Sequence, residues 1–151
     1  METLFERILL LKQGMAFTHV PTESLRIVAA ELVPEFFPAG DLVFRKYDQG
    51  EQMYIIQQGS IGISIEDHPR GDQFIALLSP GDCFGEMGML DDQPRSASAH
   101  VIEDSQLLIL EKGRLIALLS RYPELALGIL RSLSLRLRES NARLDALRQD
   151  P

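Results

Sequence analysis

Hydrophobic residues recur at helical spacing near the start of the chain, over residues 1–34. Leu4 and Ile8 begin a first apolar stripe, and a second stripe with the same period follows it. The second stripe lies between Pro21, which suits the first turn of a helix, and Pro34, which ends one. This segment is therefore predicted to be helical.

Residues 35–111 have a different rhythm, in which apolar positions alternate or form short runs between turn formers. Ile61, Ile63 and Ile65 alternate with small residues, the pattern of a strand with one buried face. The other strand-like runs are 53–56, 74–78 and 107–110, and the turn glycines are Gly40, Gly50, Gly59, Gly71 and Gly81. We expect an α+β fold, mainly β: an eight-stranded antiparallel, jelly-roll-like β-roll flanked by helices.

The helical period returns over residues 113–149, with a break at Tyr122-Pro123 that divides this segment into two helices. The second helix carries a heptad seam of Ala126, Leu130, Leu133, Leu137, Ser140, Leu144 and Leu147. We expect the first half of the seam to pack on the roll and the second half to pair with a second copy of the chain. The alternative is one long helix packed wholly on its own roll.

Composition limits the classes of protein that fit these elements. A chain of 151 residues is predicted to form one domain, with residues 1–34 helical, 35–111 in the roll and 113–149 in the C-terminal helices. The net charge of −7 argues against sequence-independent binding to nucleic acid or to anionic membranes. The single cysteine excludes an internal disulfide, and the longest apolar runs, five residues, are too short to span a membrane. We expect a cytoplasmic protein.

One stretch, residues 80–98, carries candidate chemistry. A strand is expected to end at Gly85 and a helical turn to begin at Glu86, leaving free backbone N–H groups at the loop. Arg95 is the only cation of the stretch, and the small neighbours Ser96 and Ala97 allow an anion to approach it. A phosphate fits Arg95, and a carboxylate such as Glu86 accepts hydrogen bonds from ribose hydroxyls. The alternative is a pair of turn glycines beside a solvated Glu86–Arg95 pair.

The stretch resembles the phosphate-binding cassette of the cyclic-nucleotide-binding domain family, with Phe84-Gly85-Glu86-Met87-Gly88-Met89-Leu90 followed by Pro94-Arg95-Ser96-Ala97. The resemblance extends over about residues 10–147. It implies a β-roll that binds cAMP or cGMP, with Glu86 on the ribose 2′-hydroxyl and Arg95 on the cyclic phosphate. Amides of Gly85, Glu86 and Ala97, together with Ser96, complete the cradle. The residues expected to bind ligand are Phe84, Gly85, Glu86, Met87, Arg95, Ser96 and Ala97.

One turn departs from the family pattern, because Lys46-Tyr47-Asp48 stands where the family usually has Glu-Gly-Asp. We expect Tyr47 to take a different type of turn. Since this turn is remote in sequence from the cassette, its loop geometry rather than ligand binding should change.

The predicted function is that of a non-catalytic sensor of cAMP or cGMP that needs no cofactor and transmits binding through its last helix. Polar residues of that helix, such as Ser134 or Ser140, are expected to meet the purine edge. The partner is a second copy or an effector protein. Direct nucleic-acid binding is not expected, because the interleaved acidic residues indicate a solvated helix face and the sequence stops at Pro151 before a helix-turn-helix.

Two other classes of protein are alternatives to this predicted function. A degenerate roll used only as an interaction scaffold would fold without binding nucleotide. A cupin-like metal enzyme would need closely spaced histidines, whereas His19, His68 and His100 are far apart in the sequence. Cys83 is expected to be buried packing rather than a reactive thiol.

Overall fold

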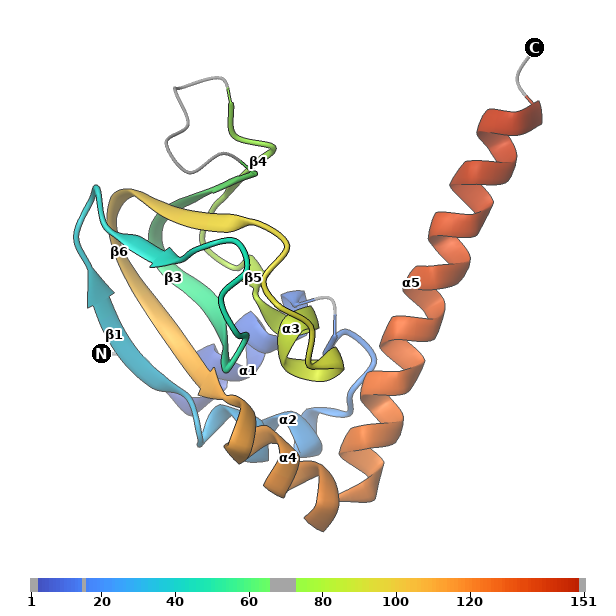
Figure 1. Ribbon diagram of the computed structural model, residues 1–151. Helices are drawn as coiled ribbons and strands as arrows, with labels where there is room; N and C mark the ends of the chain where they lie inside the picture. The colour runs from blue at the N-terminus through green and yellow to red at the C-terminus, as the bar shows by residue number, and fades with distance from the viewer. Residues whose placement is uncertain (1–2, 15, 66–72, 150–151) are drawn as a thin grey trace.

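The computed structural model describes residues 3–14, 16–65 and 73–149, so His68 and Gly71 lie outside the described residues. Two short helices open the chain, α1 (Leu4–Gln13) and α2 (Thr22–Ala29) (Figure 1). α1 begins with a capping box in which the side chains of Thr3 and Glu6 each accept a hydrogen bond from the other residue's backbone N–H. α2 buries its apolar stripe as the sequence pattern predicts, whereas α1 buries Ile8 and Leu11 but leaves Leu4 exposed.

The described strands form one antiparallel sheet in the order β1-β6-β3-β4, with β2 paired to β6 and β5 paired to β3 (Figure 1). Their bounds are β1 Val33–Phe37, β2 Leu42–Phe44, β3 Gln52–Ser64, β4 Ala76–Leu78, β5 Cys83–Phe84 and β6 Ser98–Glu111. β1 begins one residue before Pro34 and lies at an edge of the sheet, where the missing proline N–H is tolerated. The fold is therefore α+β with an antiparallel sheet, as predicted.

The predicted number of eight strands is not confirmed, because the described residues form six. The runs 53–56 and 61–65, which look like separate strands in the sequence, fall largely within the single strand β3. β3 and β6 pair along most of their length, but their register shifts between Ile56 and Ile61. Such irregularities let a strand bend without ending, so one long strand can follow the curve of the roll. At this bend φ of Gly59 is 100° and a Cβ there would lie 2.6 Å from the Asp104 carbonyl oxygen, so only glycine fits.

The buried apolar residues form two clusters, to which β3 and β6 contribute alternate residues. One cluster joins the helices to the lower end of the sheet and is built around residues such as Leu11, Leu25 and Leu125. The other fills the roll and includes Ile56, Phe84 and Leu107. The candidate binding stretch takes part in both clusters, because Phe84 belongs to the second and Met89 to the first.

Two helices follow β6, α4 (Lys112–Arg121) and α5 (Pro123–Gln149), separated at Tyr122 as predicted. α5 contacts the loop before α2 closely. A Cβ on Gly128 would lie 3.0 Å from Val20 Cα, and the His19 backbone N–H donates to Ser132 Oγ at 2.9 Å. Among the described residues, no helix is both long and apolar enough to cross a membrane.

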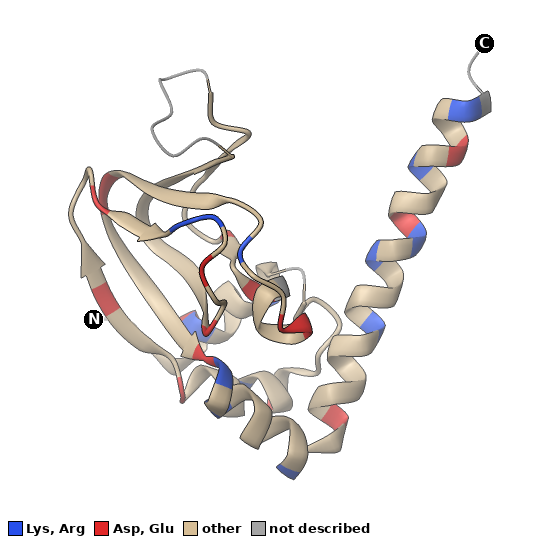
Figure 2. Cartoon of the chain, in the orientation of Figure 1, with Lys and Arg blue, Asp and Glu red and all other residues tan. Residues whose placement is uncertain are grey.

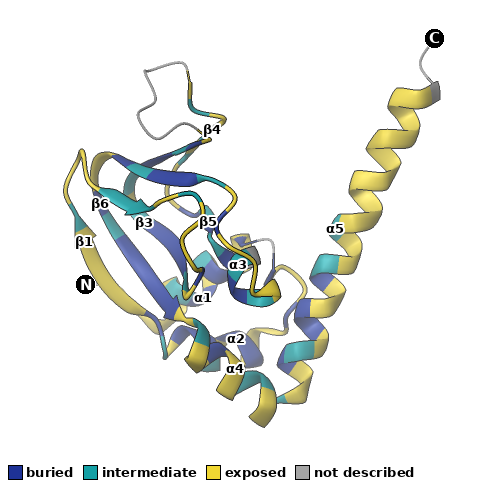
Figure 3. Ribbon diagram, in the orientation of Figure 1, coloured by how far each residue is buried: buried dark blue, intermediate teal, exposed yellow. Residues whose placement is uncertain are grey.

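The way α5 packs corrects the expectation for its heptad seam. The buried face of the helix consists of Leu125, Gly128, Ile129 and Ser132, not of the first seam residues. Of the seam, Leu133 packs against the core, whereas Leu130 and Leu137 are each 62% exposed. Residues 137–148 are all exposed, and this half of the helix extends beyond the other elements (Figures 1 and 3). Most of the seam is therefore free along the whole helix rather than in its second half alone.

The Lys46-Tyr47-Asp48 turn also differs from expectation, because Tyr47 keeps the left-handed backbone that a glycine would favour, with φ 78°. The turn is not remote from the cassette in space. The Tyr47 N–H donates to the Arg95 carbonyl at 2.8 Å, and the Arg95 N–H donates to the Asp48 carbonyl at 2.7 Å. The turn thus holds the backbone of the cassette arginine.

Relief of this left-handed conformation should stabilise the protein. Tyr47→Gly is expected to raise the free energy of unfolding by roughly 0.5–1 kcal/mol, since glycine adopts positive φ without steric cost. Urea denaturation measures the change. Tyr47→Ala is the matched control, because it removes the exposed ring but keeps the Cβ and its strain. An equal gain from both variants would show that the ring, not the backbone, is the cause.

Candidate functional site

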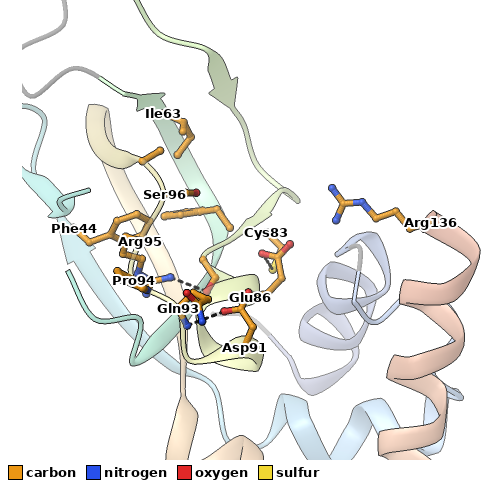
Figure 4. Close-up of a pocket in the computed structure, with 14 residues that line it drawn as sticks. Phe44, Ile63, Cys83, Glu86, Asp91, Gln93, Pro94, Arg95, Ser96 and Arg136 are labelled. Atoms are coloured by element: carbon orange, nitrogen blue, oxygen red, sulfur yellow. Dashed lines mark hydrogen bonds between the residues drawn. The ribbon is translucent and has the colours of Figure 1, made fainter. Parts of the chain in front are cut away.

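A cavity of about 460 Å³ opens between the cassette and α5 (Figure 4). Its volume lies in the usual range for small-ligand sites. All of the predicted binding residues whose side chains are described line it: Phe84, Gly85, Glu86, Arg95, Ser96 and Ala97. Met87 follows Glu86 in the same helix, and its side chain lies outside the described part of the structure. The cavity is further lined by Phe44 and Ile63 from the roll.

The turn from β5 into α3 (Glu86–Asp91) places Glu86 at the cavity. The local prediction is confirmed, since β5 ends at Phe84 and Gly85 precedes the helix with φ 83°. A Cβ on Gly85 would lie 2.7 Å from Arg95 Nη1, so this position needs glycine both for its backbone and for its close approach to the guanidinium. The glycine therefore brings the two charged residues of the site together.

Arg95 is buried in the cavity wall, with 5% of its surface exposed. Nη1 donates to the Gly85 carbonyl at 2.7 Å, Nη2 donates to the Gln52 carbonyl, and the guanidinium lies 4.1 Å from the centroid of the Phe44 ring. Burial lowers the pKa of Arg95, while the nearby groups Tyr54 and Asp48 act in the opposite direction. Nε is buried and has no hydrogen-bond partner among the described residues. A buried cation with an unused donor suits an anionic ligand.

Glu86 is the second buried charge, with 7% of its surface exposed. Burial raises the pKa of its carboxyl above the usual value. A hydrogen bond to its own backbone, the positive charge of Arg136 and the thiol of Cys83 all act to lower the same pKa. A carboxylate only accepts hydrogen bonds, so Glu86 can receive donors such as sugar hydroxyls but repels a phosphate.

The burial of the Glu86 charge predicts that this charge destabilises the ligand-free protein. Glu86→Gln is expected to raise the free energy of unfolding of the ligand-free protein at pH 7 by on the order of 1 kcal/mol. The sign follows from the raised pKa of Glu86, because stability falls as the pH rises through a pKa that is higher in the folded than in the unfolded chain. The gain should be much smaller near pH 4, where the carboxyl is mostly protonated in both states. Denaturation curves at pH 4 and pH 7 measure it, and an equal gain at both would contradict the explanation.

Arg136 of α5 lines the cavity, although the basic and acidic residues that intermingle along this helix (Figure 2) predict a solvated face. Figure 4 shows its side chain reaching from α5 toward Cys83 and Glu86. By contrast, Ser134 and Ser140, the residues expected at the purine edge, are exposed. The sequence does indicate this position of Arg136. Ile129, Ser132 and Arg136 are spaced three and four residues apart, so Arg136 lies on the same face of the helix as the two buried residues.

The remaining candidate residues lie elsewhere or serve packing. His19 is exposed in the loop between α1 and α2, and a ring nitrogen of His100 lies 2.9 Å from Ser64 Oγ. Within the described ranges, no cluster of three or more His, Cys, Asp or Glu side chains is arranged to hold a metal ion. Cys83 packs against the helical core cluster, and burial raises the pKa of its thiol. This supports the interpretation of Cys83 as a packed rather than a reactive thiol.

The chain is similar to known proteins both in sequence and in fold. It belongs to the cyclic nucleotide-binding domain family, whose model matches residues 34–122. It is 33% identical over 138 residues to the cyclic AMP receptor protein of Thermus thermophilus, an alignment that covers 91% of this chain and 63% of the relative. The chain thus spans less than two thirds of that relative's length.

Solved structures show the same fold. The N-terminal domain of a transcriptional regulator from Streptomyces coelicolor has a TM-score of 0.77 and 26% identity, covering 89% of this chain and 94% of that domain. The regulatory domain of Toxoplasma gondii PKA, crystallised with cAMP, has a TM-score of 0.67 and 25% identity, covering 78% of this chain and 46% of that one.

Proposed function

We propose that this chain is a non-catalytic cyclic nucleotide sensor whose ligand binds in the cavity between the cassette and α5. The observation that carries the proposal is the pair of buried opposite charges, Arg95 and Glu86, on one cavity wall. Arg95 is a buried cation on the cavity wall and suits the cyclic phosphate, and Glu86 suits the ribose 2′-hydroxyl. Membership of a family of regulatory domains supports a sensor rather than an enzyme. The cytoplasmic location stays a prediction.

The proposed ligand is cAMP or cGMP, because Arg95 and Glu86 would contact only the parts that the two nucleotides share. The names of two similar proteins mention cyclic AMP, which supports cAMP as the first ligand to test. The base would lie toward Phe44, Ile63 and Arg136, which offer two apolar surfaces and one cation. One good hydrogen bond from a purine edge changes relative affinity by about fivefold. We therefore expect a preference between the two well below a hundredfold.

Binding would be transmitted through α5, since Arg136 brings this helix to the cavity while Gly128 and Ser132 fix it to the loop before α2. A ligand that contacts both the cassette and Arg136 favours the arrangement in which α5 stays close to the cassette. Hydrogen exchange tests this step. Protection over residues 125–137 should rise at saturation with cAMP or cGMP, and unchanged exchange there with confirmed occupancy would remove α5 from the mechanism.

Calorimetric titration of the purified chain with cAMP and cGMP tests the proposed function itself. Saturable binding of one ligand per chain is expected, and 5′-AMP is the matched control because it has the same base and sugar but no cyclic phosphate. A folded protein that binds neither cyclic nucleotide would favour the scaffold alternative. Metal analysis of the same sample tests the cupin-like alternative, which requires a bound transition metal.

The proposed partner is a second copy of the chain, through the seam of α5, or an effector protein that covers the same leucines. The seam and the cavity lie on different faces of the helix, since Arg136 shares the buried face while Leu130 and Leu137 are exposed. Ligand and partner could therefore occupy α5 at the same time. The similar proteins include a transcriptional regulator, and this chain covers only part of the length of its curated relatives.

A further inference from the structure

Among the described residues that line the cavity, Cys83 on β5 and Glu86 on α3 make a polar contact that the proposed function does not use. The Cys83 thiol donates to Glu86 Oε2 at an S···O distance of 3.8 Å. Figure 4 shows the two side chains side by side at the edge of the cavity that faces Arg136. A thiol is a weak donor, but here its acceptor is a buried carboxylate, for which each hydrogen bond counts more than in water.

Cys83 lies next to the backbone of Gly14 on the side away from the cavity. A Cβ on Gly14, in the loop after α1, would lie 3.2 Å from Cys83 Cβ and 3.6 Å from its Sγ. Gly14 is buried, and its carbonyl accepts a hydrogen bond from Thr18 Oγ1 at 3.0 Å. The Cys83 side chain therefore lies between the backbone at Gly14, where a larger residue would crowd it, and the Glu86 carboxylate.

The cavity shows independently that it is built for a ligand. Arg95, on the same wall, is 95% buried and keeps Nε without a hydrogen-bond partner among the described residues. A carboxylate that must meet one sugar hydroxyl in such a cavity gains from being oriented before the ligand arrives, because less rotational freedom is then lost on binding.

We infer that Cys83 is a positioning residue for ligand recognition, whose thiol orients the Glu86 carboxylate toward the ribose 2′-hydroxyl. The inference rests on the proposed function, since it assigns a role within the proposed cyclic nucleotide site. The effect of Cys83 on the pKa of Glu86 agrees in direction, because a donor to the charged form lowers that pKa. Cys83 needs no thiolate for this role, in keeping with the raised pKa of its thiol.

The test compares the binding of cAMP with that of 2′-deoxy-cAMP. The second ligand lacks only the 2′-hydroxyl, whose hydrogen bond Glu86 would accept. Wild type should prefer cAMP. In Cys83→Ala the preference should fall by about threefold to tenfold, since a carboxylate without its thiol donor is less well oriented. Cys83→Ser, which keeps a donor, should retain most of the preference. Thermal melting of each variant confirms that it is folded, and Cys83→Val replaces Cys83→Ala if the smaller side chain unfolds the protein.

The outcomes separate the inference from the function on which it rests. If Cys83→Ala weakens both ligands equally and leaves their ratio unchanged, Cys83 only packs and the inference is wrong, while the sensor function stands. If wild type binds both ligands with the same affinity, Glu86 does not read the hydroxyl, and the role of Cys83 falls with it. If wild type binds neither ligand, the proposed function fails first.

Discussion

Replacing Arg95 by alanine is expected to weaken cAMP binding by about 2–4 kcal/mol, which is the cost of losing a charge-assisted contact to a phosphate in a partly desolvated cavity. Arg95→Lys should recover only part of the loss. A lysine cannot donate to the carbonyls of Gly85 and Gln52 and also present a planar face to the Phe44 ring. Calorimetric titration of wild type and both variants measures the differences.

Arg95 also supports the cassette backbone, so its substitution needs a structural control. Thermal melting without ligand shows whether each variant keeps its fold. Gln93→Ala serves as the matched control for binding, because Gln93 lines the same cavity but is exposed, and its loss should change affinity by less than about 0.5 kcal/mol. Wild-type affinity in a folded Arg95→Ala protein would show that the phosphate is bound elsewhere.

The second large effect is expected on assembly. If the seam of α5 pairs two chains, Leu144→Asp combined with Leu147→Asp should raise the dimer dissociation constant by at least about a hundredfold, because it places carboxylates in an apolar interface. Both leucines are exposed in the single chain, so the fold itself should be unaffected. Sedimentation velocity of wild type and variant over a range of concentrations measures the change.

Ala142→Asp combined with Ala146→Asp is the matched control for this experiment. These exposed alanines lie on the opposite side of the helix from the seam, so the same added charge should leave the dimer intact. A wild-type protein that sediments as a monomer at high concentration would exclude the dimer and leave an effector as the partner of the seam.

The sequence predicts the cassette well because its chemistry is local. Gly85 to Ala97 are close in the chain, and the features that matter there, a glycine turn, a short helix and an arginine among small residues, depend on near neighbours. The break at Tyr122 was predictable for the same reason, since proline constrains the residue before it. The helical ends of the chain follow from a periodicity that each segment carries by itself.

What the sequence leaves open depends on contacts between distant segments. Two apolar runs separated by Gly59 fit two strands as well as one bent strand, and only the pairing of β3 with β6 decides between them. In the sequence, Arg136 resembles the solvated arginines of the same helix. Only the packing of α5 beside the cavity distinguishes it from them. The register of α5 was wrong because two heptad patterns run along it, and the core selects the less hydrophobic one through Gly128 and Ser132.

Gly128 of α5 lies close to Val20, and α5 can act as a lever with this contact as its fulcrum. The contact lies near the start of a helix of 27 residues, so about 20 residues follow this fulcrum, and residues 137–148 are all exposed. At 1.5 Å per residue the long arm measures about 30 Å, and a rotation of about 5° at the fulcrum moves its tip by roughly 2.6 Å. Arg136 lies on the same arm, about 12 Å from the fulcrum, where the same rotation amounts to roughly 1 Å. A displacement of roughly 1 Å at the cavity thus becomes more than twice as large at the C-terminal end of the seam.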